Sequence, residues 1–379
     1  MKIKICKNCI QPDTRPNIYF NEEGICGACL WEQEKETINW HTRENELQEI
    51  ADNAKKNTTS NYDCVIGVSG GKDSTFQAIT ARDKLGLNCL LINYQPESIT
   101  DIGIENIENL KTLGFDSITV RPNPEVMKKL IRSDFFQHLN PVKVTEFALY
   151  ACTYIMAEKF NIPLIIQGEN PAYTLGISAA GVGKDSNALN VKNFPTLSSG
   201  WKPYVGIDGV SEKDLFLYHY DKEKLEEKGI RAIWLQYYRK EWSQTHNAEF
   251  SRKYGLKWRD EDFDPSEFGT YSRFTGLDSE FNPLNQMLKY IKFGFGHCLD
   301  QACYDLREKR ITRNEAINLV LKYDGKCSEK YIQNLCDFIK ITVDDFWSHS
   351  NKFRGKMWKK NNVNEWVNEF ETLLRKEIK

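Results

Sequence analysis

The amino-acid sequence predicts an α/β fold in which a mostly parallel sheet is covered by helices on both faces. Short apolar runs alternate with longer amphipathic stretches between residues 62 and 170, which is the pattern of strands joined by crossover helices. The first apolar run leads directly into a glycine turn and then into a helical pattern. From residue 283 onward the periodicity is helical, so a helical region is expected to follow the sheet domain.

Strands are expected where apolar runs are short, and helices where apolar residues recur every three or four positions. The expected strands are Cys64–Val68, Leu87–Asn93, Ser117–Val120, Ile162–Ile166 and Arg231–Leu235. The expected helices of the sheet domain are Lys72–Leu85, Ile102–Leu113, Pro124–Leu139, Val142–Phe160 and Asp214–Lys228. The expected C-terminal helices are Leu284–Phe293, Leu299–Lys309, Arg313–Tyr323, Ser328–Ile339, Val343–Phe353 and Val363–Ile378, with Thr312 and Glu315 placed as a capping box.

Changes in composition along the chain predict three units. Residues 1–60 hold four cysteines, a turn-rich stretch and a polar linker helix. Residues 61–282 are predicted to form the α/β domain, in which the part after residue 170 is rich in Gly, Ser and aromatic residues. That part is either a set of plain loops or a cover over a substrate. Residues 283–379 are predicted to be helical.

The composition of the whole chain excludes several classes of protein. Among 379 residues, 51 are basic and 53 are acidic, so the formal charge of -2 provides no bulk attraction to nucleic acid or to an anionic membrane. No apolar run approaches the roughly 18 residues of a membrane span, and charges interrupt the first apolar residues too early for a signal peptide. We therefore expect a cytoplasmic protein whose partners include neither nucleic acid nor a membrane.

The N-terminal cysteines have the spacing of a metal site. Cys6-Lys-Asn-Cys9 and Cys26-Gly-Ala-Cys29 are separated by sixteen residues, as in paired zinc knuckles. Four thiolates around one ion close a tetrahedral shell, which makes such a site structural. We predict a zinc ribbon within residues 1–60, while the spacing alone leaves iron, a redox pair and four unrelated thiols as alternatives.

Residues 69–74, Ser-Gly-Gly-Lys-Asp-Ser, indicate phosphate binding. A turn between a strand and a helix presents unpaired backbone N–H groups and the positive end of the helix dipole to an anion. The two glycines allow the backbone to approach closely, while the serine hydroxyls and Lys72 add donors and positive charge. The run is not a Walker A loop, because Asp73 follows the lysine where Ser or Thr is required. An acidic residue beside phosphate calls for a cation between them, so Asp73 predicts Mg²⁺.

The Ser-Gly-Gly-Lys-Asp-Ser run resembles the signature of the PP-loop ATP pyrophosphatases, which cleave ATP between the α and β phosphates and transfer AMP to a carbonyl oxygen. Within that class the chain resembles the N-acetyl sugar amidotransferases of surface-polysaccharide and pseudaminic-type nonulosonic acid biosynthesis. Four stretches carry this resemblance: the cysteine pairs with Pro12-Asp-Thr-Arg-Pro16 between them, the phosphate loop, Gly168-Glu-Asn-Pro171, and the run from Lys292-Phe-Gly-Phe-Gly296 to Ala316. The family often has Arg after the last of these glycines, whereas this chain has His297.

The resemblance implies a PP-loop ATP pyrophosphatase fold of the HUP-like type, with an N-terminal zinc ribbon and a C-terminal helical region. It also implies that ATP adenylates the acetamido oxygen of a sugar or nucleotide-sugar, that ammonia attacks the activated carbon, and that AMP leaves an acetamidino group. A separate glutaminase is expected to supply the ammonia. The implied cofactors are ATP, Mg²⁺ and structural Zn²⁺.

The same resemblance implies roles for individual residues. The expected ATP-binding residues are Ser69, Gly70, Gly71, Lys72, Asp73, Ser74 and Gly168. The expected catalytic residues are Asp73, Lys72, Glu169, Lys292 and His297. Glu169 would make a second metal contact or orient the acceptor, and Lys292 and His297 would stabilise charge on the α-phosphoryl group. The plainer alternatives are a solvated loop acid at 169 and helix C-terminal cations at 292 and 297.

Two other functions compete with the sugar amidotransferase. Some thiolating enzymes that modify tRNA also combine a PP-loop with paired cysteines, but the balanced charge of this chain lacks the basic excess of a tRNA binder. A zinc-ribbon interaction module with an inactive phosphate loop is the third possibility. Release of pyrophosphate with an ammonium salt as the nitrogen source distinguishes an active enzyme from such a module.

Overall fold

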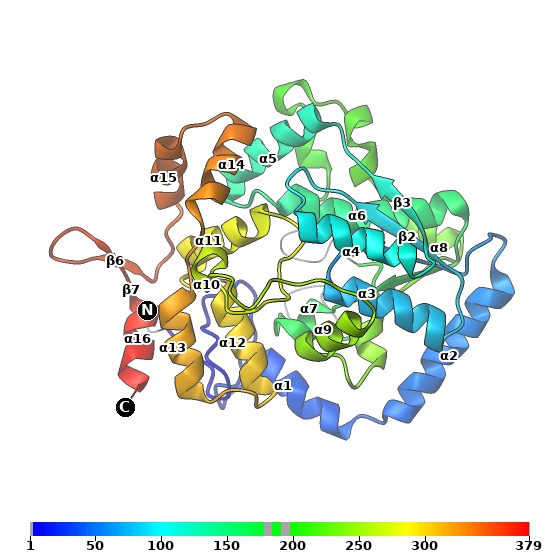
Figure 1. Cartoon of the computed structure of the whole chain (residues 1–379), viewed down its shortest axis with the longest axis horizontal. Helices are drawn as coiled ribbons and strands as arrows, with labels where there is room; N and C mark the ends of the chain where they lie inside the picture. Colours follow the sequence, from blue (N-terminus) through cyan, green and yellow to red (C-terminus); the bar gives the residue numbers. More distant parts are fainter. Residues whose placement is uncertain (1–2, 178–183, 191–197, 379) are drawn as a thin grey trace.

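The computed structural model describes residues 3–177, 184–190 and 198–378 and confirms the α/β class (Figure 1). One sheet contains five parallel strands in the order β3-β2-β1-β4-β5. Their bounds are β1 Cys64–Val68, β2 Cys89–Tyr94, β3 Asp116–Val120, β4 Leu164–Gln167 and β5 Arg231–Trp234. Each predicted strand is confirmed, with ends shifted by at most two residues.

The strands alternate their side chains between two helical layers. Cys64, Ile66 and Val68 of β1 join a core that also contains residues of helices on one face, namely α2 (Trp40–Asn57), α3 (Lys72–Ile79), α4 (Asp101–Thr112) and α9 (Gln244–Lys253). Val65 belongs to the core on the other face, with α5 (Pro124–His138) and α6 (Lys143–Phe160). Because both faces are covered, the carboxyl ends of the strands are the open edge at which a ligand binds in such sheets.

Short elements connect these layers. They are α7 (Pro171–Thr174), α8 (Lys222–Glu227), α10 (Pro265–Phe268), a π-helical turn at Thr80–Lys84 that continues α3, and 3-10 helices at Lys35–Thr37, Lys202–Tyr204, Ile207–Gly209, Glu212–Tyr218 and Leu235–Tyr238. The predicted helix Asp214–Lys228 is therefore wrong as one element. A 3-10 helix ends at Tyr218, and α8 begins anew because the Asp221 side chain accepts hydrogen bonds from the backbone of Glu223 and Lys224.

Most of the C-terminal region is helical, as predicted. The helices are α11 (Phe281–Phe293), α12 (His297–Arg307), α13 (Arg313–Tyr323), α14 (Glu329–Ile339), α15 (Val343–Asn351) and α16 (Glu369–Glu377). The capping box of Thr312 and Glu315 is confirmed at the start of α13. The predicted helix Val363–Ile378 is wrong in its first half, where β6 (Trp358–Lys360) and β7 (Trp366–Asn368) form an antiparallel hairpin. Asn364 adopts a left-handed φ of 65° in the turn, and the Asn368 side chain caps α16.

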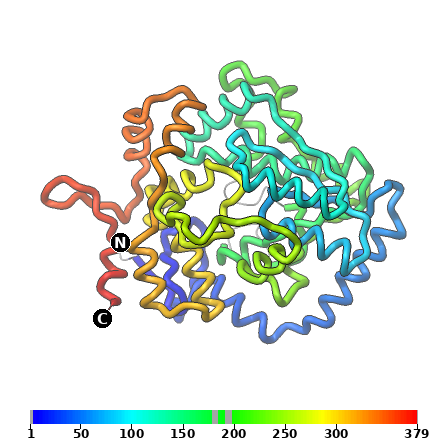
Figure 2. The backbone as a smooth tube through the Cα atoms, in the orientation of Figure 1, coloured from blue at the N-terminus to red at the C-terminus, as the bar shows by residue number. Residues whose placement is uncertain are grey.

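The N-terminal segment packs on the C-terminal helices rather than standing apart. The four knuckle cysteines share a core with residues of α12, α13 and α16. Figure 2 shows the blue N-terminal chain beside the gold and orange helices α12 and α13, which are far from it in the sequence. Helix α1 (Gly27–Glu34) then leads from the cysteines toward α2 and the sheet. Across the described parts of the chain, every helix is too short or too polar to cross a bilayer.

Candidate functional site

The phosphate loop joins the carboxyl end of β1 to the N-terminus of α3, as the sequence predicted. Gly70 has a φ of 83°, and a Cβ atom there would lie 2.7 Å from the carbonyl oxygen of Gly103, so only glycine fits. Asn106 holds the loop in place, because its amide nitrogen donates to the Gly70 carbonyl at 2.9 Å. The same side chain accepts from the Lys257 backbone at 2.7 Å. The loop is thereby tied to α4 and to the segment after α9.

Asp73 lies in the first turn of α3 and is held from two sides. Its Oδ2 is 2.6 Å from Nζ of Lys72, and its Oδ1 accepts a hydrogen bond of 2.7 Å from Nδ2 of Asn247 on α9. Asn247 is fully buried, and among the described residues its Oδ1 has no hydrogen-bond donor. Ser251, one turn further along α9, donates to the Lys72 carbonyl at 2.7 Å. Helix α9 therefore fixes the acidic end of the loop.

Glu169, just beyond the carboxyl end of β4, faces Asp73. Burial, and then the negative charge of Asp73, raise the pKa of Glu169 to about 8, while Lys72 acts in the opposite direction. Gln244 on α9 donates to Glu169 Oε1 at 2.9 Å. Glu169 is thus half-buried and hydrogen-bonded, and its expected role in metal binding or acceptor orientation stays a prediction. A cation between the two carboxylates would relieve their repulsion, so this pair fits a Mg²⁺ ion.

Gly168 is closely packed against two side chains. A Cβ atom at this position would lie 2.5 Å from Nε2 of Gln77 and 3.1 Å from the Trp242 ring. Its backbone carbonyl accepts a hydrogen bond of 3.2 Å from the Gln236 backbone. The side chains of Gln77 and Trp242 leave little room for a Cβ atom at position 168. The expected contact of Gly168 with ATP stays a prediction.

A cavity of about 270 Å³ opens beside Ser69, between the carboxyl ends of β1 and β2 and helices α6 and α11. Its lining combines apolar side chains with amides, hydroxyls and carboxylates, and the described residues contribute no Lys, Arg or His: Ser69, Tyr94, Pro96, Val142, Thr145, Glu146, Leu149, Asp278, Ser279, Asn282, Asn285 and Gln286. Gln286 has a buried Oε1 with no hydrogen-bond partner among these residues. Such a lining suits an uncharged group that carries hydroxyls or amides.

His297 and Lys292 lie in different surroundings. His297 begins α12, and its buried Nδ1 has no hydrogen-bond partner among the described residues. Burial and the nearby cations Lys289 and Arg259 lower the pKa of His297 to about 3, so the ring is neutral and is not a helix C-terminal cation. Lys292 does stand in the last turn of α11, where its Nζ donates to the His138 carbonyl at 3.0 Å. Among the described contacts, none joins Lys292 to the phosphate loop.

Two of the stretches that carry the family resemblance meet in space. Thr14 donates to the Phe293 carbonyl at 2.6 Å, and Arg15 forms an ion pair with Asp300. Lys289 lies 2.6 Å from the second oxygen of Asp300. Burial acts to raise the pKa of Asp300, but Arg15 and Lys289 outweigh it and lower the pKa. These residues join the N-terminal segment to the C-terminal helices.

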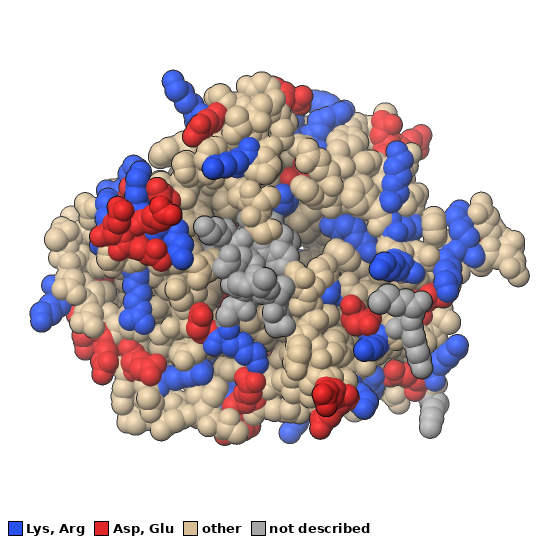
Figure 3. Space-filling model, turned by 180° about the vertical axis from the view of Figure 1, so that it is seen from behind, with Lys and Arg blue, Asp and Glu red and all other residues tan. Residues whose placement is uncertain are grey.

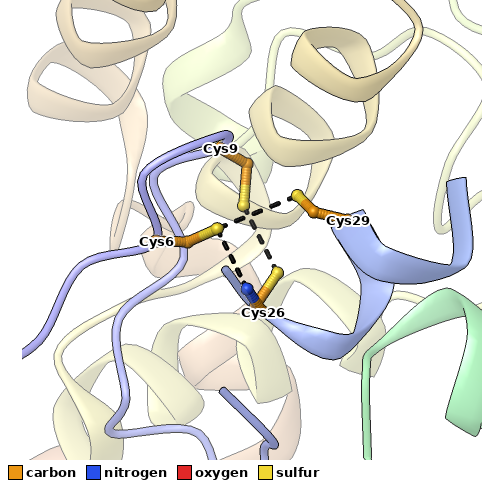
Figure 4. Close-up of side chains that lie close together, drawn as sticks. All are labelled: Cys6, Cys9, Cys26 and Cys29. Carbon is orange, nitrogen blue, oxygen red and sulfur yellow. Dashed lines mark hydrogen bonds between the residues drawn. The ribbon is translucent and has the colours of Figure 1, made fainter. Parts of the chain in front are cut away.

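The four N-terminal cysteines form one buried cluster (Figure 4). Sγ of Cys6 lies 3.8 Å from Sγ of Cys29, and Sγ of Cys9 lies 3.7 Å from Sγ of Cys26. In a tetrahedral site with Zn–S bonds of about 2.3 Å, the sulfur atoms lie about 3.8 Å apart. The backbone N–H groups of Cys26 and Gln11 point at two of the sulfurs, at 3.2 and 3.4 Å, and favour thiolates. The cluster therefore fits one zinc ion.

The sequence analysis missed several residues of the site. Asn247, Gln244 and Asn106 hold Asp73, Glu169 and the loop, and Asp278 lines the cavity. Three of the four come from the stretch after residue 170 that was expected to be loops or a cover. A polar helix with a Ser N-cap at Ser243 was the available signal for α9.

Comparison with known proteins finds a similarity in the C-terminal part of the chain. Residues 268–373 match a family model described as LPS biosynthesis protein WbpG-like, C-terminal domain. No curated protein matches the chain. An NH3-dependent NAD synthetase from Campylobacter jejuni subsp. jejuni NCTC 11168 has 18% identity and a TM-score of 0.29 over 37% of this chain and 62% of its own, so this chain spans less than two thirds of that structure.

An NMN synthetase from Francisella tularensis has 17% identity and a TM-score of 0.30 over 60% of this chain and 100% of its own. The matched residues run from the end of α10 through α11 to α15 and the β6–β7 hairpin into the first half of α16. The chain is thus similar, through its C-terminal region, to the WbpG-like proteins of LPS biosynthesis, which confirms the expected resemblance to a surface-polysaccharide family.

Proposed function

We propose that the chain is an ATP-dependent amidotransferase that converts the acetamido group of a sugar or nucleotide-sugar to an acetamidino group. The observation that carries this proposal is the meeting of Lys72, Asp73 and Glu169 at the carboxyl ends of β1 and β4, beside a polar cavity to which the described residues contribute no basic side chain. The similarity of residues 268–373 to LPS biosynthesis proteins supports a sugar as the acceptor.

In this proposal the loop holds the nucleotide. The backbone N–H groups of residues 70–74 and the N-terminus of α3 bind the β and γ phosphates, and Lys72 adds positive charge. Asp73 and Glu169 would hold Mg²⁺, which neutralises negative charge on the phosphates. The cavity next to Ser69 takes the uncharged part of a ligand, because its lining lacks a cation for phosphate.

The reaction balances in two steps. The acetamido oxygen attacks the α-phosphorus of ATP, the bond to the β-phosphate breaks, and pyrophosphate leaves. Ammonia then attacks the imidate carbon, AMP departs with the former amide oxygen, and a proton is lost.

A partner glutaminase is proposed to supply the ammonia. A small cavity of about 40 Å³ lies between α1 and α12. Gln244 lines this cavity, and its side chain donates a hydrogen bond to Glu169. Trp31 and Tyr173, whose rings stack with centroids 3.8 Å apart, also line it. Its size suits ammonia or water, so we propose it as part of a sheltered path to the carboxyl end of β4.

The test incubates the chain with ATP, Mg²⁺, an ammonium salt and candidate diacetamido sugars, followed by mass spectrometry. The expected product shows the small mass decrease of oxygen replaced by NH, and a heavy-oxygen label in the acetamido group appears in AMP. The Asp73→Asn variant should form no product. Formation of ADP instead of AMP would contradict the proposal. Release of AMP that requires tRNA and does not depend on any of the sugars would also contradict it and would favour the tRNA-modifying alternative.

A further inference from the structure

The β6–β7 hairpin projects from the molecule and concentrates basic and apolar side chains. In Figure 1 it extends away from the helices at one side of the fold. We call residues 352–368 the basic hairpin. This segment contains five basic side chains and one acidic one, Glu365: the basic residues are Lys352, Arg354, Lys356, Lys359 and Lys360. A whole-chain charge of -2 conceals this local excess, which Figure 3 shows as blue side chains at the base of the projection.

The tip of the basic hairpin carries apolar side chains in water. Every residue from 359 to 367 is exposed. Val363 is 71% exposed, and Trp366 and Val367 are each 38% exposed. Arg354 and Lys360 flank the Trp366 ring, with charge-to-centroid distances of 5.3 and 4.8 Å. A partner that binds these two cations would therefore also contact the indole ring of Trp366.

This combination fits a lipid surface better than a folded protein. Trp and aliphatic side chains ringed by Lys and Arg are typical of segments that lie in the headgroup region of anionic bilayers. A specific protein interface takes about 20–30 residues on each side, whereas the exposed tip spans residues 359–367. We propose that the basic hairpin docks the chain on anionic lipid bilayers. This inference does not rest on the proposed function.

The consequence is peripheral attachment that depends on salt and on lipid charge. Each basic side chain near an anionic surface contributes roughly fivefold to binding, and the contribution falls off within a Debye length. Within the described structure, Lys359 is the only one of these five basic side chains that forms an ion pair, and its partner is Glu369. The other four basic side chains carry no ion pair in the described structure, although Arg354 donates to the Asn351 side chain and Lys360 to the Asn364 carbonyl, so their charges are not neutralised within the chain. The short apolar tip adds shallow insertion of Val363 and Trp366.

Co-sedimentation with vesicles tests the proposal on the full chain. We expect the chain to pellet with vesicles of phosphatidylcholine and phosphatidylglycerol, to pellet less at high salt, and to remain in solution with phosphatidylcholine alone. The double variant Lys356→Glu/Lys360→Glu should bind at least tenfold more weakly, by roughly fivefold for each site. The matched control, Lys56→Glu/Lys213→Glu, changes the net charge equally at exposed residues on α2 and on the 3-10 helix before α8 and should bind as the wild type does.

A second measurement locates the contact. Brominated lipids quench nearby tryptophans, so wild type should lose more fluorescence than Trp366→Phe on addition of brominated anionic vesicles. Circular dichroism confirms that each variant is folded. Equal losses of binding in the two double variants, or equal quenching of wild type and Trp366→Phe, would overturn the proposal. A folded chain that pellets with neither type of vesicle would also overturn the proposal. That result would favour a protein as the partner of the basic hairpin.

Discussion

At the scale of single residues, the site depends on a partner for Asp73 that lies far away in the sequence. Asn247 donates to Asp73 at 2.7 Å, and Glu169 faces the same carboxylate. A hydrogen bond to a charged group contributes about 1.5–3 kcal/mol. Asn247 therefore orients the carboxylate that is proposed to hold Mg²⁺.

We predict that Asn247→Leu, which keeps the volume but loses the donor, raises the Mg²⁺ concentration needed for half-maximal pyrophosphate release by about tenfold or more. The KM for ATP at saturating Mg²⁺ should change less. Asn247→Gln tests rescue by a longer amide. If Asn247→Leu leaves the Mg²⁺ dependence unchanged, Asn247 has no positioning role.

A second residue-scale prediction concerns Asp134, a buried carboxyl group outside the site. Burial raises the pKa of Asp134 to about 7, although Lys143 and the hydroxyl of Tyr204 act to lower it. The folded chain then binds a proton that the unfolded chain releases near pH 4. This stabilisation is fully present below about pH 4 and is lost as the pH rises to about 7.

Asp134→Asn should therefore flatten the pH dependence of the free energy of unfolding between about pH 4 and 7, by an amount on the order of a few kcal/mol. Denaturant titrations at several pH values measure it. Asp262→Asn, at an exposed position, serves as the control and should retain the wild-type slope. Parallel curves for wild type and Asp134→Asn would show that Asp134 does not titrate in this window.

At the scale of elements, the two glycines in the turn between β1 and α3 are needed for different reasons. Gly70 has a positive φ and a neighbour at 2.7 Å, whereas Gly71 has a φ of -93° and its nearest atom to an added Cβ is Ser69 Oγ at 3.5 Å. Backbone strain and a clash with α4 oppose a side chain at the first position only. At the second position a side chain fits the protein but takes the space a phosphate needs.

Gly70→Ala should lower the free energy of unfolding by about 1–3 kcal/mol, whereas Gly71→Ala should unfold near the wild-type temperature and yet bind ATP much more weakly. Thermal unfolding and calorimetric titration with ATP measure the two effects. Wild-type ATP affinity in Gly71→Ala would mean that this turn does not cradle phosphate.

At the scale of the whole molecule, the cysteine cluster is part of the C-terminal core. Arg313 of α13 donates to the Cys9 carbonyl at 2.6 Å and to the Cys6 carbonyl at 3.2 Å, and α12 contributes to the same apolar core. A metal ion at the cysteines would therefore stabilise helices distant in the sequence, because structural zinc supplies free energy of folding.

Cys26→Ser/Cys29→Ser should lose about one zinc ion per chain and speed amide hydrogen exchange in α1, α12 and α13. Helices α5 and α6, which belong to another core, should exchange as in wild type. Metal analysis and hydrogen-exchange mass spectrometry measure these effects, and Cys327→Ser controls for loss of a thiol. Unchanged zinc content would show that the cluster is not the zinc site.

The sequence by itself determined the parallel sheet, the positions of its strands, the phosphate turn and the cysteine cluster. These features depend on local signals: apolar runs of strand length, a glycine turn before a helix, and the spacing of cysteine pairs. It failed at α8 and at the hairpin before α16, where Asp221, Asn364 and Asn368 set the breaks and caps against a helical hydrophobic pattern.

Only the tertiary structure decided which residues complete the site. Asn247, Gln244 and Asp278 come from a part of the chain without a strong pattern, and they reach Asp73, Glu169 and Ser69 because α9 and the segment before α11 fold over the carboxyl edge of the sheet. Likewise, Arg15 meets Asp300 only because the N-terminal knuckles pack on α12. Local periodicity reports which face of an element is buried, but contacts between distant segments are set by packing.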